Sequence, residues 1–240
     1  MAMADARDRL IVALDVAGEA QARSLVSTLE DSVGFYKVGK ELFTACGPAF
    51  VRELVKSGKR VFLDLKFHDI PNTVAGAVRS ASELGISLLT VHASGGSKML
   101  KAAADAAAQS AARPTVLAVT VLTSLGAGEL GEIGVAGSVA EQVERLAGLA
   151  LKAGCGGLVA SAQEARRLRE LFGKEFALVT PGIRPAGGEV GDQARVVTPA
   201  DAIQAGATYL VVGRPITASP DPRKAAEATR DEIETASARV

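Results

Sequence analysis

The chain has 240 residues, and its 27 lysines and arginines balance 27 aspartates and glutamates, which excludes the basic excess typical of proteins that bind nucleic acid. No apolar run approaches the roughly 20 residues that cross a bilayer, and the N-terminus lacks the apolar stretch of a secretory signal, so no membrane partner is expected. Cys46 and Cys155 match neither a metal-ligand nor a disulfide pattern, which favours the reducing cytoplasm.

Short apolar runs alternate with longer amphipathic runs along the chain. The apolar runs predict strands at 10–15, 35–39, 60–66, 87–93, 115–122, 156–161, 177–182 and 209–214. The amphipathic runs predict helices near 18–31, 41–57, 70–84, 97–112, 138–153, 161–172, 198–205 and 222–236. Eight such units in this length match a closed (β/α)8 barrel, the TIM barrel, better than an open sheet. We therefore expect a protein of the α/β class with a single TIM-barrel domain over residues 1–240.

Charged residues stand at the carboxyl ends of the first predicted strands, where active sites of this fold lie. Asp15 ends the first strand, and Lys37 lies within the second. A lysine between Tyr36 and Val38 in a buried strand would be a costly unpaired charge, so it needs an acidic partner. Asp64, which we place at the matching level of the adjacent strand, is the expected partner.

The run from Arg60 to Thr73 reads R-V-F-L-D-L-K-F-H-D-I-P-N-T. Its first half predicts a strand, and its second half predicts a helix start with Asp69 as a possible N-cap. Because strand side chains alternate, Asp64 and Lys66 are expected on one face, with Asp69 just beyond the strand end. Taken alone, this segment also fits a solvated run of charges that ends in a capping aspartate.

Two later segments predict a phosphate site. P-G-I-R-P at 181–185 and V-G-R-P at 212–215 each supply a glycine and an arginine, Arg184 and Arg214, in the loops that follow the seventh and eighth strands. Barrels of this kind often hold phosphate in these loops, and guanidinium groups suit bidentate phosphate binding. The alternative is a pair of surface arginines beside turn glycines. Residues 183–193, long and glycine-rich for such a loop, are expected to form a lid.

Several segments together resemble orotidine 5′-phosphate decarboxylases of the bacterial type. The segment 64–74, D-L-K-F-H-D-I-P-N-T-V, is similar to the signature of that family, and further segments follow in family order. These are A-L-D at 13–15, Y-K-V-G at 36–39, V-T-V-L-T-S at 119–124, P-G-I-R-P at 181–185, D-Q-A-R-V-V-T-P at 192–199 and V-G-R-P-I at 212–216. The resemblance spans almost the whole chain. It implies a TIM barrel that converts orotidine 5′-phosphate into uridine 5′-phosphate, the last step of pyrimidine nucleotide synthesis, without a cofactor.

The resemblance also implies a role for each matching residue. Lys37, Asp64, Lys66 and Asp69 would form an alternating array of charges around the reacting carbon, with Lys66 as the proton donor. The other subunit of a homodimer would contribute Asp69. The remaining implied contacts with substrate are Asp15 at the ribose, Thr73 at the ribose of the partner's substrate, Thr123 at the pyrimidine, and Arg184, Gln193, Gly213 and Arg214 at the phosphate.

The chemistry of this decarboxylation suits Lys66. Loss of CO2 from the pyrimidine C6 leaves a carbanion that no adjacent carbonyl delocalises, so the site must supply a fixed positive charge and then a proton. Two neighbouring carboxylates favour the charged form of the lysine, which argues against a Schiff-base aldolase because that enzyme needs a neutral amine.

Two other functions remain as alternatives. A metal-dependent sugar-phosphate aldolase or decarboxylase of the same barrel family would share the D-x-K-x-x-D core, but such enzymes carry an acidic residue where this chain has Lys37. A ligand-binding barrel without activity would not need four charges at its mouth. No metal is expected, because neither His68 nor His92 has a second imidazole or thiol at ligand spacing in the sequence.

Overall fold

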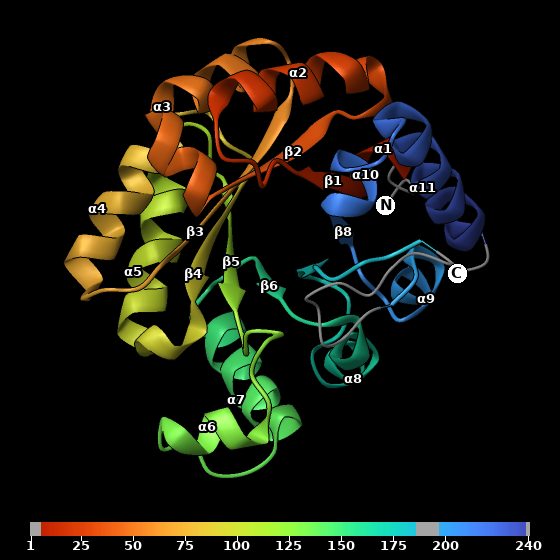
Figure 1. Cartoon of the computed structure of the whole chain (residues 1–240). Coiled ribbons are helices and arrows are strands. Elements are labelled where there is room, and N and C mark those ends of the chain that lie inside the picture. The colour runs from red at the N-terminus through yellow and green to blue at the C-terminus, as the bar shows by residue number, and fades with distance from the viewer. Residues whose placement is uncertain (1–5, 186–196, 239–240) are drawn as a thin grey trace.

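A closed parallel barrel dominates the computed structural model, which describes residues 6–185 and 197–238 (Figure 1). The strands follow one another around the barrel in sequence order, and β1 closes the ring by pairing with β8. Their bounds are β1 Leu10–Ala13, β2 Phe35–Gly39, β3 Arg60–Phe67, β4 Leu88–His92, β5 Thr115–Val119, β6 Gly157–Val159, β7 Ala177–Thr180 and β8 Tyr209–Val212. The predicted TIM-barrel fold is thus confirmed.

Helices surround the strands on the outside of the barrel (Figure 1). Their bounds are α1 Ala6–Arg9, α2 Glu19–Leu29, η1 Glu30–Ser32, α3 Lys40–Lys56, α4 Pro71–Ser82, η2 Ala93–Gly95, α5 Gly96–Gln109, α6 Ala127–Glu132, α7 Val139–Lys152, α8 Ala162–Phe172, α9 Pro199–Gln204, α10 Arg214–Thr217 and α11 Pro222–Ser237. Within the two described ranges, no helix combines the length and apolar character needed to cross a membrane.

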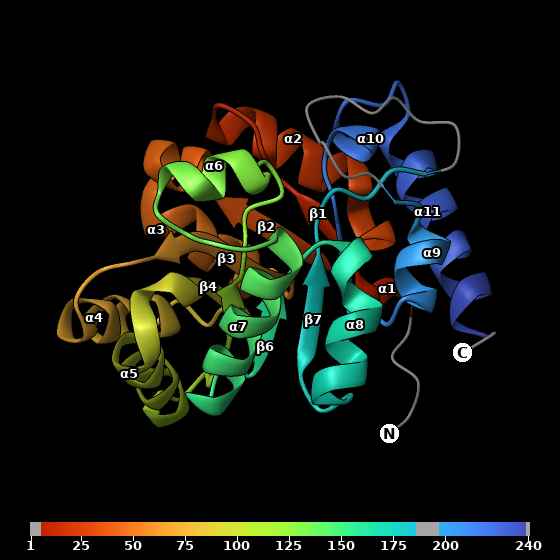
Figure 2. The ribbon, with the colours of Figure 1, turned by 90° about the horizontal axis from the view of Figure 1, so that it is seen from below.

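The structure corrects the predicted elements at their ends. The predicted strand 115–122 ends at Val119, and most other strands also stop before their predicted carboxyl ends. Polar loop residues at these ends leave the sheet and turn into the mouth of the barrel. Helices α1, α6 and α10 were not predicted. Four residues, as in α1 and α10, carry too few turns for an amphipathic pattern, and two of the six residues of α6 are glycines, which are poor helix formers. Figure 2 shows α6 and α10 on the side toward which β7 points.

The interior of the barrel is filled by apolar side chains. One buried cluster lies inside the ring of strands and consists of Ile11, Ala13, Phe35, Phe62, Leu88, Leu117, Val179 and Val211. A larger buried cluster lies between the strands and the helices, and includes Leu10, Val12, Tyr36, Val38, Leu63 and Leu89. Because consecutive strand residues alternate between the two clusters, the side-chain period of two sorts each strand into an inner and an outer face.

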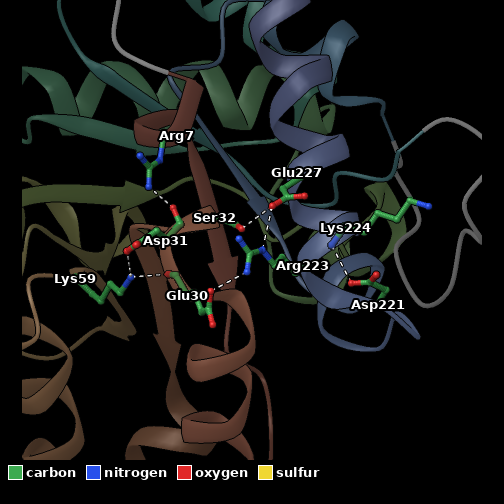
Figure 3. Close-up of polar contacts among 9 residues, drawn as sticks. All are labelled: Arg7, Glu30, Asp31, Ser32, Lys59, Asp221, Arg223, Lys224 and Glu227. Carbon is green, nitrogen blue, oxygen red and sulfur yellow. Dashed lines mark hydrogen bonds and ion pairs between the residues drawn. The ribbon is translucent and has the colours of Figure 1, made fainter.

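A group of polar side chains lies on the outside of the barrel, where η1 meets α11 (Figure 3). We call Glu30, Ser32, Lys59, Arg223 and Glu227 the η1 cluster. The Arg223 guanidinium lies 2.7 Å from Glu30 Oε2 and 3.1 Å from Glu227 Oε1. Ser32 Oγ donates to Glu227 Oε1, and Lys59 Nζ donates to the Glu30 carbonyl at 2.7 Å. These contacts tie the last helix to the segment between α2 and β2, close to where β1 and β8 close the ring.

Candidate active site

A cleft of about 630 Å³ opens at the carboxyl ends of the strands. Its apolar floor includes side chains of the inner cluster, and polar side chains form its walls. The lining residues that carry polar groups or glycine are Asp15, Lys37, Asp64, Lys66, Thr123, Ser124, Gly182, Arg184, Gly213, Arg214 and Thr217. Thus eight of the residues predicted for substrate binding or catalysis meet in one cavity.

The alternation of strand side chains explains why the polar walls stand on the apolar floor. Lys37 comes two residues after Phe35, and Asp64 comes two residues after Phe62, so each points to the same inner side as the apolar residue below it. The barrel therefore carries one layer of charge above one layer of hydrocarbon. In that position the charges are shielded from water on one side, which strengthens their mutual interactions.

The charges in the cleft form a continuous chain of ion pairs. Lys66 Nζ lies 2.7 Å from Asp64 Oδ1 and 2.8 Å from Oδ2. Lys37 Nζ lies 3.7 Å from Asp64 Oδ2 and 2.6 Å from Asp15 Oδ1. The side chains of Lys37 and Asp64 are only 10% and 12% exposed, whereas that of Asp15 is 57% exposed. Charges of opposite sign thus alternate from Asp15 at the rim, through the buried Lys37 and Asp64, to Lys66.

The electrostatic surroundings of Asp64 keep it ionised. Burial by itself raises the pKa of this carboxyl group. The Lys66 and Lys37 cations, together with hydrogen bonds from Lys66 and Thr90, outweigh burial and hold the pKa of Asp64 below its ordinary value. The cleft therefore presents a fixed carboxylate between two ammonium groups.

The partner of Lys37 is only partly as predicted. Asp64 does contact Lys37, but its Cα pairs with Gly39 and not with Lys37, which pairs with Phe62. The nearer partner is Asp15, reached because the first strand ends beside the second. Gly39 makes room for this pair, since a Cβ at that position would lie 2.9 Å from both Asp15 Oδ1 and Lys37 Nζ. Gly39 was not among the predicted site residues, although it ends the motif Y-K-V-G.

The backbone at Lys66 is unusual. Between the pairs Leu63 with Leu89 and Phe67 with Val91, β3 has three residues opposite a single residue of β4, Thr90. This bulge places Lys66 at a φ of 53°, in the left-handed region, which costs a non-glycine residue roughly 1–2 kcal/mol. The prediction that Asp64 and Lys66 share a face is confirmed by their contact. The bulge was not predicted, because no glycine signals it.

Two predicted residues lie outside the cleft. Asp69 and Thr73 are exposed and do not line the cavity of their own chain. The prediction of Asp69 as an N-cap is wrong, because Ile70 occupies the N-cap position of α4 and Pro71 is the first helical residue. The Asp69 carboxylate instead accepts a hydrogen bond from the Ile70 N–H at 2.6 Å. Its neighbour Ile70 is 67% exposed, so this strand-to-helix turn presents both a charge and an apolar side chain to the outside.

The predicted phosphate residues Arg184, Gly213 and Arg214 also line the cleft. Arg184 is buried, and both burial and the neighbouring Arg214 cation lower the pKa of its guanidinium group. Two cations held close together favour an anion between them. The Arg184 N–H donates to the Val197 carbonyl at 3.1 Å, so residues 184 and 197, which stand before and after the undescribed range 186–196, lie side by side. Gln193, and residues 186–193 of that lid, fall outside the described residues.

The two histidines, distant in the sequence, come together in the fold. The ring centroids of His68 and His92 are 5.5 Å apart. Burial and the neighbouring His68 lower the pKa of His92. Among residues 6–185 and 197–238, no group of three or more His, Cys, Asp or Glu side chains could hold a metal ion.

A TIM barrel with a charged cleft at the carboxyl ends of its strands and paired arginines in the last two loops defines an enzyme that acts on a phosphorylated small molecule. Residues 8–229 match the family described as orotidine 5′-phosphate decarboxylase / HUMPS, and the chain belongs to this family.

Known relatives agree with this assignment. The chain is 55% identical to the orotidine 5′-phosphate decarboxylase of Moorella thermoacetica over 95% of its own length and 93% of the relative. It is 52% identical to the enzyme of the same name from Nitrosococcus oceani, over 95% and 98% of the two chains. The crystal structure of orotidine 5′-phosphate decarboxylase from Lactobacillus acidophilus superposes with a TM-score of 0.84 at 42% identity, covering 93% of this chain and 98% of that one.

Proposed function

We propose that this protein decarboxylates orotidine 5′-phosphate to uridine 5′-phosphate, the last step of pyrimidine nucleotide synthesis, without a cofactor. The observation that carries the proposal is the chain of alternating charges that ends at Lys66, whose ammonium lies within 2.8 Å of both oxygens of Asp64. The relatives that share more than half of the sequence bear the name of this activity.

Lys66 is the proposed proton donor. The Lys66 ammonium, held against Asp64 beside the pyrimidine C6, would stabilise the carbanion that remains when CO2 leaves. The same group then transfers its proton to C6, which completes the product. Asp64 holds the ammonium in place, and Lys37, pinned by Asp15 and Asp64, fixes the carboxylate from the other side.

The remaining lining residues are proposed to bind the nucleotide. Asp15 is exposed at the rim although it pairs with Lys37, so its second oxygen can accept from ribose hydroxyls. Thr123 lines the cleft and is proposed to lie against the pyrimidine. Arg184, Gly213 and Arg214 are proposed to hold the phosphate, assisted by Gln193 from the lid over 183–193.

We propose a homodimer in which each subunit completes the site of the other. Asp69 and Thr73 lie beyond the end of β3 and outside the cavity of their own chain, Asp69 beside the exposed Ile70 and Thr73 in the first turn of α4. In a symmetric dimer the same surface meets its own copy, so both sites would borrow the pair. Asp69 of the partner subunit would then extend the array of Lys37, Asp64 and Lys66.

Subunit mixing tests this dimer. Lys66→Ala and Asp69→Ala chains, each nearly inactive alone, should regain activity when refolded together, because one site of each mixed dimer then contains neither change. Random mixing makes about half of all dimers mixed, so roughly a quarter of all sites carry neither change. Absence of activity above the sum of the separate variants, with mixed dimers shown to be present, would place Asp69 in the site of its own chain.

We propose that the protein acts in the cytoplasm. Cys46 and Cys155 are both free thiols, which fits the cytoplasm.

We propose that residues 1–240 act as one barrel domain.

A chelator assay tests the activity directly. Purified protein mixed with orotidine 5′-phosphate and excess chelator should remove the ultraviolet absorbance of the substrate at an undiminished rate. Loss of activity on chelation, or activity restricted to sugar phosphates, would favour the metal-dependent alternative of the same family.

A further inference from the structure

Thr90 lies just beneath the charged wall of the cleft. It is in the middle of β4, is fully buried, and pairs with Leu117 of the inner cluster, so its side chain points into the barrel. It comes two residues after Leu88, as Lys37 and Asp64 come two residues after their inner apolar neighbours. Thr90 does not line the cavity.

The hydroxyl of Thr90 joins two groups of the proposed site. It accepts a hydrogen bond from the Lys66 backbone N–H at 2.9 Å and donates to Asp64 Oδ1 at 2.9 Å. The bulge in β3 takes the Lys66 N–H out of the regular ladder with β4, so the hydroxyl replaces the carbonyl that a regular strand would offer. A single side chain therefore fixes both the backbone of the proton donor and the carboxylate that orients its ammonium.

We propose that Thr90 is a positioning residue for the decarboxylation, which holds Lys66 in its left-handed conformation and Asp64 in register with it. This inference rests on the proposed function. A small displacement of a proton donor lowers the rate far more than it lowers substrate affinity, because the interaction with the developing carbanion exists only in the transition state. Thr90 thus acts on turnover through Lys66 and Asp64, without touching the nucleotide.

The barrel offers a matched control in Thr180 of β7. Thr180 is also fully buried in a strand, but it pairs with Leu210 of the outer cluster, and its hydroxyl has no hydrogen-bond partner in the described part of the chain. Replacing an unpaired buried hydroxyl by a methyl group of the same shape removes no hydrogen bond. Thr180→Val therefore measures the cost of the same substitution without the proposed positioning role.

The experiment compares Thr90→Val, Thr90→Ser and Thr180→Val with the native protein by steady-state decarboxylation and thermal unfolding. Thr90→Val should lower kcat by about 10- to 100-fold, as expected for a lost hydrogen bond to a charged group, while KM changes less than about threefold. Thr90→Ser keeps the hydroxyl and should restore kcat to within about threefold of native. Thr180→Val should leave kcat unchanged.

Each outcome decides between the proposals. If the native protein does not convert orotidine 5′-phosphate, the proposed function and this inference both fall. Should the native protein be active and Thr90→Val keep its kcat, or Thr90→Ser lose as much as Thr90→Val, only the inference is overturned. A Thr90→Val protein that is unfolded in the assay is replaced by Thr90→Ala. If neither folds while Thr180→Val does, Thr90 serves folding and the positioning role is rejected.

Discussion

The cleft and the η1 cluster contain the same kinds of charge at the same distances, yet they differ in burial. Lys66 and Asp64 lie 2.7 Å apart in the cleft, and Arg223 and Glu30 lie 2.7 Å apart on the surface. The cleft pair has side chains 24% and 12% exposed, whereas the surface pair is 50% and 62% exposed. Water screens the surface pair, so its members lose little when separated. Removing one member of the buried pair leaves an uncompensated charge.

Burying a charge costs free energy, so the buried charges of the cleft point to a functional role more strongly than the exposed charges of the η1 cluster do. The Arg223 ion pairs of the η1 cluster are made by exposed side chains that solvent would satisfy equally well. The cleft holds its charges above an apolar floor, with a bulge, a left-handed lysine and a glycine that leaves room for the Lys37 ammonium. Such arrangements persist at sites of chemistry, where strain and pre-organisation serve the reaction.

The largest expected effect is that of Lys66→Ala. This change should lower kcat by more than about 100-fold, because it removes the proposed proton donor, while the variant still folds and binds nucleotide. Steady-state kinetics and nucleotide titration measure the two effects separately. Lys59→Ala in the η1 cluster is the matched control and should leave kcat unchanged. A Lys66→Ala variant with more than about a tenth of native turnover would contradict the role of Lys66.

A smaller loss is expected from Gly39→Ala. The φ of Gly39 is −91°, which any residue adopts, so the substitution acts through its Cβ, which would lie 2.9 Å from Lys37 Nζ. Displacing this ammonium should lower kcat/KM roughly 10-fold by misplacing the array. Gly34→Ala is the control, because a Cβ there has no neighbour within 4 Å. Equal kinetics of the two variants would show that the close approach at Gly39 has no bearing on the site.

Acid should weaken the buried array. Folding lowers the pKa of Asp64, so its ionised form stabilises the protein above about pH 3.8, its ordinary pKa, and this contribution is lost as the pH falls through the lower pKa of the folded state. The stability difference between native protein and Asp64→Asn should therefore shrink at acid pH in denaturant titrations. A difference that stays constant down to the acid transition would mean that Asp64 is not held in its charged form by its neighbours.

The smallest effect is expected from Arg223→Ala. The hydrogen bond from Arg223 lowers the pKa of Glu227, but both groups are open to solvent. The unfolding temperature should change by less than about 3 °C, and kcat should stay native. Differential scanning calorimetry in low and high salt measures this contribution. A larger, salt-independent loss would show that the η1 cluster behaves like the buried array, and the comparison of the two regions would fail.

The order of strands and most helices could be predicted because the apolar pattern has a clear period in each. Strand ends could not, because Val119 and Thr120 are equally suited to a strand by composition, and only the residue pairing with β6, which ends at Val119, distinguishes them. Lys37, Asp64 and Lys66 were found from charge in or at the ends of buried strands. Arg184 and Arg214 were found from the glycine-arginine motifs of the last two loops. Their pairing was less accessible, since Asp15 meets Lys37 only through the stagger of the barrel.

Thr90 shows a different limit of sequence analysis. A threonine in an apolar strand is an ordinary β-former, and nothing in L-L-T-V-H marks its hydroxyl as paired. Its hydroxyl is paired because of the bulge in the neighbouring strand β3, and the sequence does not signal that bulge. The prediction of Asp69 as an N-cap was wrong for another reason. An aspartate shortly before a proline resembles an N-cap, but α4 begins at Pro71, one residue later than that role requires.

The apolar cluster inside the strands determines how substrate enters the cleft and how products leave it. Phe35, Phe62 and their neighbours fill the axis of the barrel below the charged layer, so the cleft is a cup with a closed base. The mouth must therefore serve as entrance and exit alike. Carbon dioxide would leave through the same opening by which the nucleotide entered. The product nucleotide would have to leave through this opening before the next substrate molecule could bind.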